Sequence, residues 1–194
     1  MYTILLDSSN TKLGVGLAKN NELLEVISYE AWQQQSEYMV LELNKLLTKY
    51  EVKNEDIESV MVAVGPGSYT GVRIAITIAK TISVALGVKI YPVSSLQVLK
   101  STKKPSICLI NARSKRSYIG VYENEKVILK DTIMSNLEVL SYIDNHPEYV
   151  VCGDTAYLQK EGYISNTIEE MLSLKGHIVP NESSFDVKPV YLKD

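Results

Sequence analysis

Alternating hydrophobic and polar positions fill the first thirty residues of the chain. Three short runs alternate in this way, and polar turns at 7–10 and 19–21 separate them. Runs of this length, bounded by Asn, Asp and Ser, are typical of β-strands joined by turns. The pattern therefore predicts a three-stranded meander with strands at 3–6, 13–18 and 23–29.

The periodicity then changes from two residues to between three and four. Hydrophobic residues recur at this spacing from residue 36 to residue 50, which predicts an amphipathic helix. An almost purely apolar run at 59–64 predicts a buried strand, and a glycine-rich loop leads from it into a second helix over 71–86, which Gly87 ends. A strand at 89–93 completes a β-β-β-α-β-α-β order, and a short helix begins at Ser94 or Ser95.

The second half of the chain repeats this order in a shorter form. Strands are predicted at 106–111, 118–122, 126–129 and 149–152, with a helix at 135–143 between the last two. Two copies of a β-β-β-α-β-α unit resemble the duplicated α/β fold of the actin, hexokinase and Hsp70 superfamily, a ribonuclease H-like fold. We therefore expect two actin-like subdomains, at 1–100 and 101–194. The second is reduced, and its tail from 183 onward is extended.

Composition and charge narrow the class of protein. The 194 residues are 45% hydrophobic, the formal net charge is −3, and only three arginines are present. No basic leader opens the chain, and no apolar stretch approaches the roughly 18 residues of a membrane span. We expect a globular cytoplasmic protein with reduced cysteines at Cys108 and Cys152. Because the chain lacks a basic field for phosphates, we expect it to meet RNA only through another protein.

The glycine loop leaves two interpretations open. Gly65, Gly67 and Gly71 lie between a buried strand and a helix, where backbone N–H groups can hold an anion. The loop is not a P-loop, because Val72 and Arg73 stand where Lys and Ser or Thr would follow the last glycine. The other interpretation is a tight turn that lets the strand and the helix pack closely.

The loop also carries a family resemblance. The run Gly-Pro-Gly-Ser-Tyr-Thr-Gly-Val-Arg-Ile at 65–74 closely resembles the signature of the TsaB family, also called YeaZ. Weaker matches are Asp-Ser-Ser at 7–9, Gln-Ser-Glu at 35–37, Ala-Lys-Thr at 79–81, Val-Ser-Ser-Leu at 93–96 and Pro-Val-Tyr-Leu at 189–192. The chain departs from the family at Asn111, where an Asp is usual, and in its short C-terminal region.

The resemblance implies a function without catalysis. Proteins of this family are non-catalytic subunits of the complex that transfers a threonylcarbamoyl group to the N6 of the adenosine beside the anticodon, in tRNAs that read ANN codons. They form a heterodimer with the transferase TsaD, help to recruit the ATPase TsaE, and form a homodimer when TsaD is absent. The resemblance implies no required cofactor, and weak ATP or ADP binding at or near the partner interface.

The two helices of the first half are the predicted docking surface. A small-residue stripe at Gly71, Ala75, Ala79 and Ser83 lets another element approach closely, and that element is either the subunit's own sheet or a partner helix. The family resemblance favours the partner. The predicted interface residues are Met39, Leu43, Leu46, Val72, Ala75, Ile76, Ile78, Ala79, Ile82 and Ser83.

The remaining candidate residues concern a nucleotide or a reaction. A weak nucleotide site is predicted at Asp7, Ser8, Gly65, Gly67 and Ser68. Asp154 is a second candidate acid, since actin-like ATPases carry acids after the first strand of each half, although either aspartate can simply cap a turn.

Two rival functions follow from these residues, an independent actin-like ATPase or kinase and a serine peptidase built on Ser68. No histidine can be nominated as its base, and His146 and His177 lie too far apart in sequence to suggest a metal site. We assign neither a catalytic residue nor a metal ligand.

Overall fold

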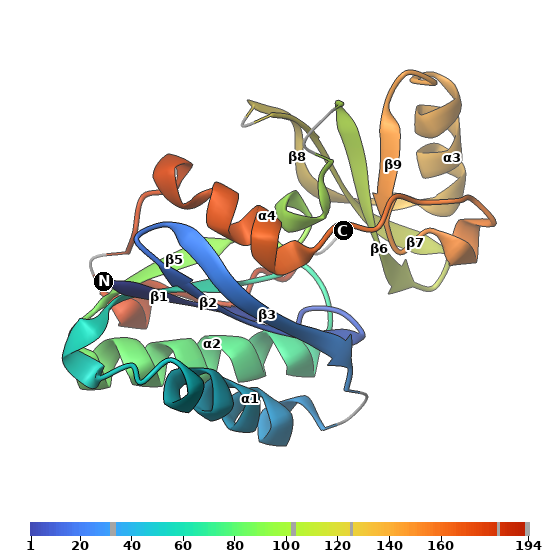
Figure 1. Ribbon diagram of the computed structural model, residues 1–194. Coiled ribbons are helices and arrows are strands. Elements are labelled where there is room, and N and C mark those ends of the chain that lie inside the picture. Colours follow the sequence, from blue (N-terminus) through green and yellow to red (C-terminus); the bar gives the residue numbers. More distant parts are fainter. Residues whose placement is uncertain (32–33, 102–103, 125, 182, 193–194) are drawn as a thin grey trace.

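Two mixed β-sheets organise the chain, one in each half (Figure 1). The computed structural model describes residues 1–31, 34–101, 104–124, 126–181 and 183–192. The strands of the first sheet are β1 (Tyr2–Asp7), β2 (Lys12–Lys19), β3 (Glu22–Glu30), β4 (Ile57–Ala63) and β5 (Lys89–Val93). Those of the second sheet are β6 (Ser106–Arg113), β7 (Arg116–Glu123), β8 (Lys126–Ser135) and β9 (Val150–Gly153).

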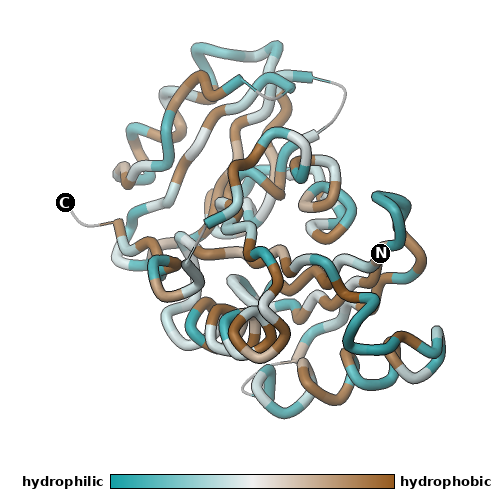
Figure 2. The backbone as a smooth tube through the Cα atoms, turned by 90° about the vertical axis from the view of Figure 1, so that its left-hand side faces the viewer, coloured by the Kyte–Doolittle hydropathy of each residue, from teal (hydrophilic) through white to brown (hydrophobic). Residues whose placement is uncertain are grey.

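Helices connect these strands and cover the sheets. The α-helices are α1 (Gln35–Lys49), α2 (Tyr69–Leu86), α3 (Asn136–Asp144) and α4 (Thr167–Ser173). Short 3-10 turns are η1 (Asn54–Asp56), η2 (Gln97–Leu99), η3 (Ala156–Leu158), η4 (Lys175–His177) and η5 (Ser184–Asp186). Hydrophobic residues concentrate in the strands and along α2, while the turns between elements are mostly hydrophilic (Figure 2). This is the distribution that burial of apolar surface produces.

The strand order is the same in the two sheets. The first sheet runs β3-β2-β1-β4-β5 and the second β8-β7-β6-β9. The central strands β1 and β6 each pair antiparallel with the next strand and parallel with the strand after the helix. The predicted repeat and its actin-like fold are therefore confirmed. In the described residues the second sheet has no counterpart of β5, and α3 has 9 residues where α1 has 15.

Helices α1 and α2 lie side by side beneath the first sheet (Figure 1). The Ser68 side chain caps the start of α2, and Gly87 ends it with a left-handed backbone at φ 66°. By length and composition α2 would suffice to cross a membrane. However, six of its residues are buried, and several of these belong to the core formed by the sheet and α1, which makes α2 a core helix of this subdomain.

Helix α4 covers the opposite face of the first sheet, although it lies late in the sequence (Figure 1). Ile168, Met171 and Leu174 are buried there against the sheet. Gly16 on β2 makes room for this contact, because a Cβ at that position would stand 2.3 Å from the Ile168 side chain. The upper layer of the first subdomain thus comes from the C-terminal part of the chain.

The last segment also returns to the first sheet. The Asn181 N–H donates to the carbonyl oxygen of Ile90 (2.9 Å), and the Val190 N–H donates to that of Val64 (2.7 Å). The predicted boundary between 1–100 and 101–194 therefore needs correction, since the chain from about residue 165 onward packs on the first sheet. The predicted extended tail from residue 183 is found between η5 and residue 192, and its residues 193 and 194 lie outside the described part.

Candidate functional sites

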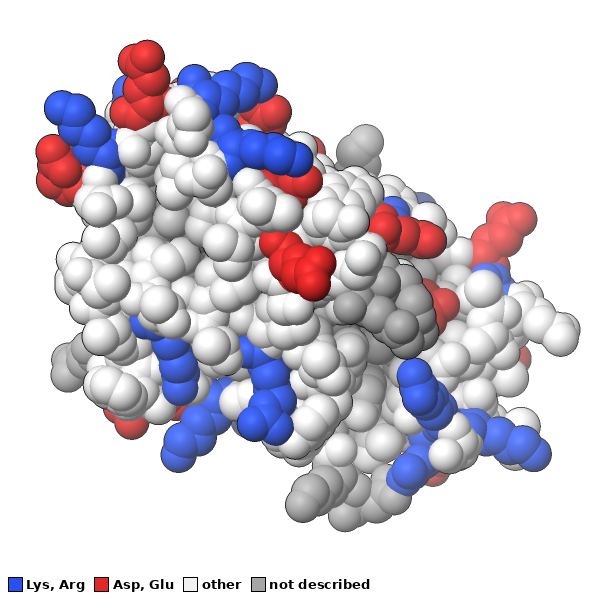
Figure 3. Space-filling model, turned by 90° about the horizontal axis from the view of Figure 1, so that it is seen from below, with Lys and Arg blue, Asp and Glu red and all other residues white. Residues whose placement is uncertain are grey.

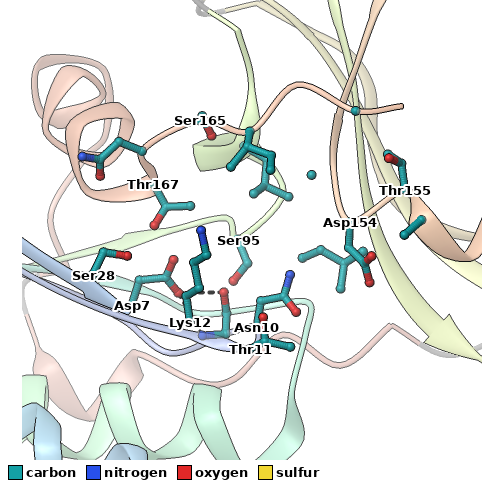
Figure 4. Close-up of a pocket in the computed structure, with 18 of the residues that line it drawn as sticks. Asp7, Asn10, Thr11, Lys12, Ser28, Ser95, Asp154, Thr155, Ser165 and Thr167 are labelled. Atoms are coloured by element: carbon teal, nitrogen blue, oxygen red, sulfur yellow. Dashed lines mark hydrogen bonds between the residues drawn. The ribbon is translucent and has the colours of Figure 1, made fainter. Parts of the chain in front are cut away.

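A cavity of about 750 Å³ separates the two sheets (Figure 4). Asp7, Asn10 and Lys12 line it from the first sheet, and Asp154 and Thr155 line it from the second. Its volume lies in the range of small-molecule sites, and its lining mixes hydroxyl, amide, carboxylate and ammonium groups. The cavity can therefore hold a polar small molecule through groups of either charge.

Asp7 ends β1 at the floor of this cavity and is only 6% exposed. Its Oδ1 accepts hydrogen bonds from the Ser9 N–H (2.9 Å) and the Ser9 hydroxyl (2.7 Å). Its other carboxylate oxygen has no hydrogen-bond donor among the described residues. The turn-capping role considered from the sequence is thus present, and one oxygen remains available to the cavity (Figure 4).

Asp154 lies on the other side of the cavity, where burial raises the pKa of its carboxyl group. It follows β9, which is the counterpart of β4, so the expectation that it follows the first strand of its half is wrong. That first strand is β6, and its end carries Asn111 instead. The Asn111 side chain accepts a hydrogen bond from the Arg113 N–H (2.8 Å), and its role there is local.

Three backbone N–H groups of the glycine loop donate hydrogen bonds to other groups of the protein. The Gly65 N–H donates to the Ser95 hydroxyl oxygen (3.0 Å), the Ser68 N–H to the Ser9 carbonyl oxygen (2.7 Å), and the Gly71 N–H to the Ser68 hydroxyl oxygen (3.2 Å). An anion would have to displace these partners. The tight-turn interpretation of the loop therefore fits the geometry better than the anion cradle.

Close backbone packing explains two of the glycines. A Cβ on Gly67 would stand 2.1 Å from the Ser9 carbonyl oxygen, and one on Gly71 would stand 1.9 Å from that of Ser8. Ser8 is fully buried, and its hydroxyl donates to the Gly71 carbonyl oxygen (2.8 Å). Of the five residues predicted to form a nucleotide site, the structure places only Asp7 on the cavity, and ATP or ADP binding stays a prediction.

Ser68 has a structural role as the cap of α2. No hydrogen bond joins it to a histidine in the described part of the chain. The His146 ring stacks on Tyr142, with centroids 4.3 Å apart, and its Nδ1 lies 2.8 Å from the Tyr142 carbonyl oxygen. Likewise, the described residues contain no cluster of three or more metal-ligating side chains.

A second candidate site is a groove of about 460 Å³ between α1 and α2. The residues that line it are Ser36, Val40, Tyr69, Thr70, Arg73, Ile74, Thr77 and Ile78. Val40 and its neighbour Leu41 are 51% and 53% exposed, which is high for aliphatic side chains. On this face a broad uncharged region lies between charged side chains near its edges (Figure 3).

The predicted interface residues lie mostly behind this groove. Eight of the ten are buried inside the subunit, namely Met39, Leu43, Leu46, Val72, Ala75, Ile76, Ala79 and Ser83. Their burial corrects the prediction that the small-residue stripe faces a partner, because the stripe is used to bring α2 close to its own sheet. Ile78 and Ile82 remain partly exposed. Val40 is an exposed groove residue that was not predicted as part of the interface. The sequence held a signal for it, because Val40 directly follows Met39 and adjacent residues of a helix point in different directions.

Comparisons with known proteins identify relatives along most of the chain. A family model described as TsaD: tRNA N6-adenosine threonylcarbamoyltransferase matches residues 26–167. The tRNA threonylcarbamoyladenosine biosynthesis protein TsaB of Bacillus subtilis (strain 168) is 32% identical over 190 residues, which cover 92% of this chain and 80% of that protein. The uncharacterized protein MG208 of Mycoplasma genitalium is 27% identical over 201 residues, which cover 100% of this chain and 95% of that protein.

A solved structure shares the fold across both subdomains. YeaZ from Pseudomonas aeruginosa superposes with a TM-score of 0.82, covering 98% of this chain and 99% of that chain at 20% identity. The agreement extends over both sheets, so the reduced second half belongs to the shared fold.

Proposed function

The chain belongs to the TsaB family of tRNA threonylcarbamoyladenosine biosynthesis proteins, and from this premise we propose that it is a non-catalytic subunit that docks onto the transferase TsaD. The groove between α1 and α2 is the docking surface. The observation that carries the proposal is the pair of half-exposed aliphatic side chains, Val40 and Leu41, beside an apolar groove. Exposed apolar area that is contiguous with a groove is typical of an interaction site.

The side chains that line the groove indicate which kind of partner it binds. The groove presents aliphatic and hydroxyl side chains and the single cation Arg73. It suits an apolar protein element better than a phosphate backbone, so TsaD rather than tRNA is its partner. In the assembled complex the chain holds TsaD in a state that transfers the threonylcarbamoyl group and helps to recruit the ATPase TsaE. When TsaD is absent, a second copy of the chain occupies the same groove.

A charge placed in the groove tests this docking. We expect Val40→Asp to weaken binding of purified TsaD by about a hundredfold or more, because a carboxylate would lose its water in an apolar contact. Ile78→Asp should act in the same direction. Ala79 is unsuited to such a test, since it is fully buried and an inserted charge would disrupt the subunit itself. Size-exclusion chromatography and calorimetric titration measure the result.

The matched control is Leu137→Asp, an equal change in charge at a side chain that is 80% exposed on α3. It should leave TsaD binding unchanged. Both variants must keep the melting temperature of the parent chain to within a few degrees. Full binding by the folded Val40→Asp and Ile78→Asp variants would refute the proposed docking surface.

A further inference from the structure

The C-terminal segment 184–191 forms a strap along α2. It is fixed in the middle by Val187, which is 2% exposed and packs in the core beneath the first sheet. It is fixed near its end by the hydrogen bond from the Val190 N–H to the Val64 carbonyl oxygen. Gly65 permits this approach, since a Cβ there would stand 2.7 Å from the Val190 carbonyl oxygen. The strap is thus held in place up to the residue before Tyr191.

Tyr191 brings the strap to the end of the α1–α2 groove. Its ring stacks on that of Tyr69, with centroids 5.1 Å apart and planes at 23°. The Arg73 guanidinium lies over the Tyr69 ring, 5.1 Å from its centroid, and Nη1 donates to the Tyr69 hydroxyl. Since Tyr69 and Arg73 also line the groove, the stack of Tyr191, Tyr69 and Arg73 is continuous with it. We name this stack the end wall.

The end wall has the composition of an interaction surface. Tyr69 and Tyr191 are 58% and 45% exposed, although stacked aromatic rings gain most when water is excluded from them. Tyr and Arg are enriched among the residues that dominate protein interfaces. Apart from the bond to Tyr69, the guanidinium N–H groups of Arg73 have no hydrogen-bond acceptor in the described part of the chain. They can therefore receive a carboxylate of a partner.

We infer that the C-terminal strap is part of the docking surface, with Tyr191 as a direct contact for TsaD. The inference rests on the proposed function and adds to it a residue that lies about 105 positions after the end of α2. The strap orders Tyr69 and Arg73 before binding, which lowers the side-chain entropy lost on association. The partner surface that fits here carries an apolar or aromatic side chain over the rings and a carboxylate facing Arg73.

Tyr191→Ala tests the strap separately from the groove. We expect TsaD binding to weaken by about tenfold or more, as for truncation of an interface aromatic, while Tyr191→Phe keeps most of the affinity. The matched control is Phe185→Ala, which removes a 75% exposed ring from the same strap near Lys80, about two turns of α2 away from Arg73. Thermal unfolding should be nearly the same for all three variants, because the removed rings are largely exposed.

The outcomes separate the two proposals. If Tyr191→Ala binds TsaD like the parent chain while Val40→Asp does not bind, the strap inference is overturned and the groove stands. If neither variant loses affinity, the proposed function fails with it. An equal loss with Phe185→Ala would also overturn the role of Tyr191, since the strap would then act without a specific contact. If Tyr191→Ala impairs only self-association, the occupant of the end wall is a second copy, which contradicts TsaD as its partner.

Discussion

At the scale of residues, hydrogen bonds join the loop after β1 to the start of α2. The Ser9 carbonyl oxygen accepts from the Ser68 N–H, and the Ser8 hydroxyl donates to the Gly71 carbonyl oxygen. The bond between Ser8 and Gly71 is buried, and an unmade hydrogen bond is costly in such a place. The glycine run therefore fixes where α2 begins relative to Asp7, and so it positions the groove and the floor of the cavity together.

This contact makes Gly71 sensitive to the smallest substitution. We expect Gly71→Ala to lower the free energy of unfolding by about 3 kcal/mol, because the new Cβ would lie 1.9 Å from the Ser8 carbonyl oxygen and the backbone must move. Urea denaturation measures the change. Gly176→Ala is the control, since a Cβ there would meet no atom within 4 Å and its stability should change little. Equal stability of the two variants would contradict the proposed packing role.

At the scale of elements, α2 shows what the sequence can predict and where it stops. Hydrophobic periodicity predicted the helix, and Gly87 marked its end, because these are local properties. The same periodicity could not decide which face of α2 is buried. Small residues such as Ala79 permit close approach of a sheet as well as of a partner helix. The choice depends on how α2 packs against β4 and α1, which lie elsewhere in the chain.

The residues that line the cavity could likewise be predicted only in part from the sequence. Asp7 was predicted as a nucleotide-site residue from its place after the first strand, and it lines the cavity between the sheets, although nucleotide binding there stays a prediction. Asp154 was predicted with it, but on a wrong assumption about its strand. Lys12 and Thr167 also line the cavity and were not predicted, because they meet only once α4 has returned over β2. Contacts between segments so distant in sequence leave no periodic signal.

A buried ion pair holds the returning helix. The Lys100 ammonium, after η2, lies 3.4 Å from a Glu170 carboxylate oxygen on α4, and the two side chains are 4% and 11% exposed. Burial raises the pKa of Glu170, and Lys100 opposes that rise. The pair therefore keeps a carboxylate charged in a place that would otherwise favour its neutral form.

Removing the lysine should make stability depend on pH. We expect Lys100→Met to destabilise the protein by about 3 kcal/mol at pH 8, since it leaves a buried carboxylate unpaired. The folded-state pKa of Glu170 then lies further above its unfolded value. The loss of stability is therefore absent at pH values below the pKa of Glu170 in the unfolded chain. It grows as the pH rises through the pKa of Glu170 in the folded variant. Urea denaturation between pH 4 and pH 8 measures this loss of stability.

The double variant Lys100→Met, Glu170→Met should recover most of the lost stability. A pH-independent loss in the single variant would contradict this account.

At the scale of the whole molecule, the first subdomain is discontinuous in sequence. Its sheet and its lower helices come from residues 1–100, its upper layer comes from α4, and the strap joins the lower layer beside α2. The second sheet and α3 are formed by the part of the chain that lies between residue 100 and α4. The Ser165 hydroxyl donates to the Val98 carbonyl oxygen (3.1 Å), so the chain leaves the first subdomain and returns to it at nearly the same point. The docking groove and the end wall both belong to this first subdomain.

The second subdomain should therefore be removable. A chain in which a short Gly and Ser linker replaces residues 101–164 keeps the whole core of the first sheet, including Ile168 and Met171. We expect it to unfold cooperatively and to bind TsaD through the groove, because the cut ends lie close together and a short loop costs little entropy to close.

The fragment 1–100 is the control. It lacks α4 and should aggregate, because the upper face of its sheet is left uncovered. Circular dichroism and TsaD titration measure both, and a well-folded 1–100 fragment would show that α4 is dispensable to this core.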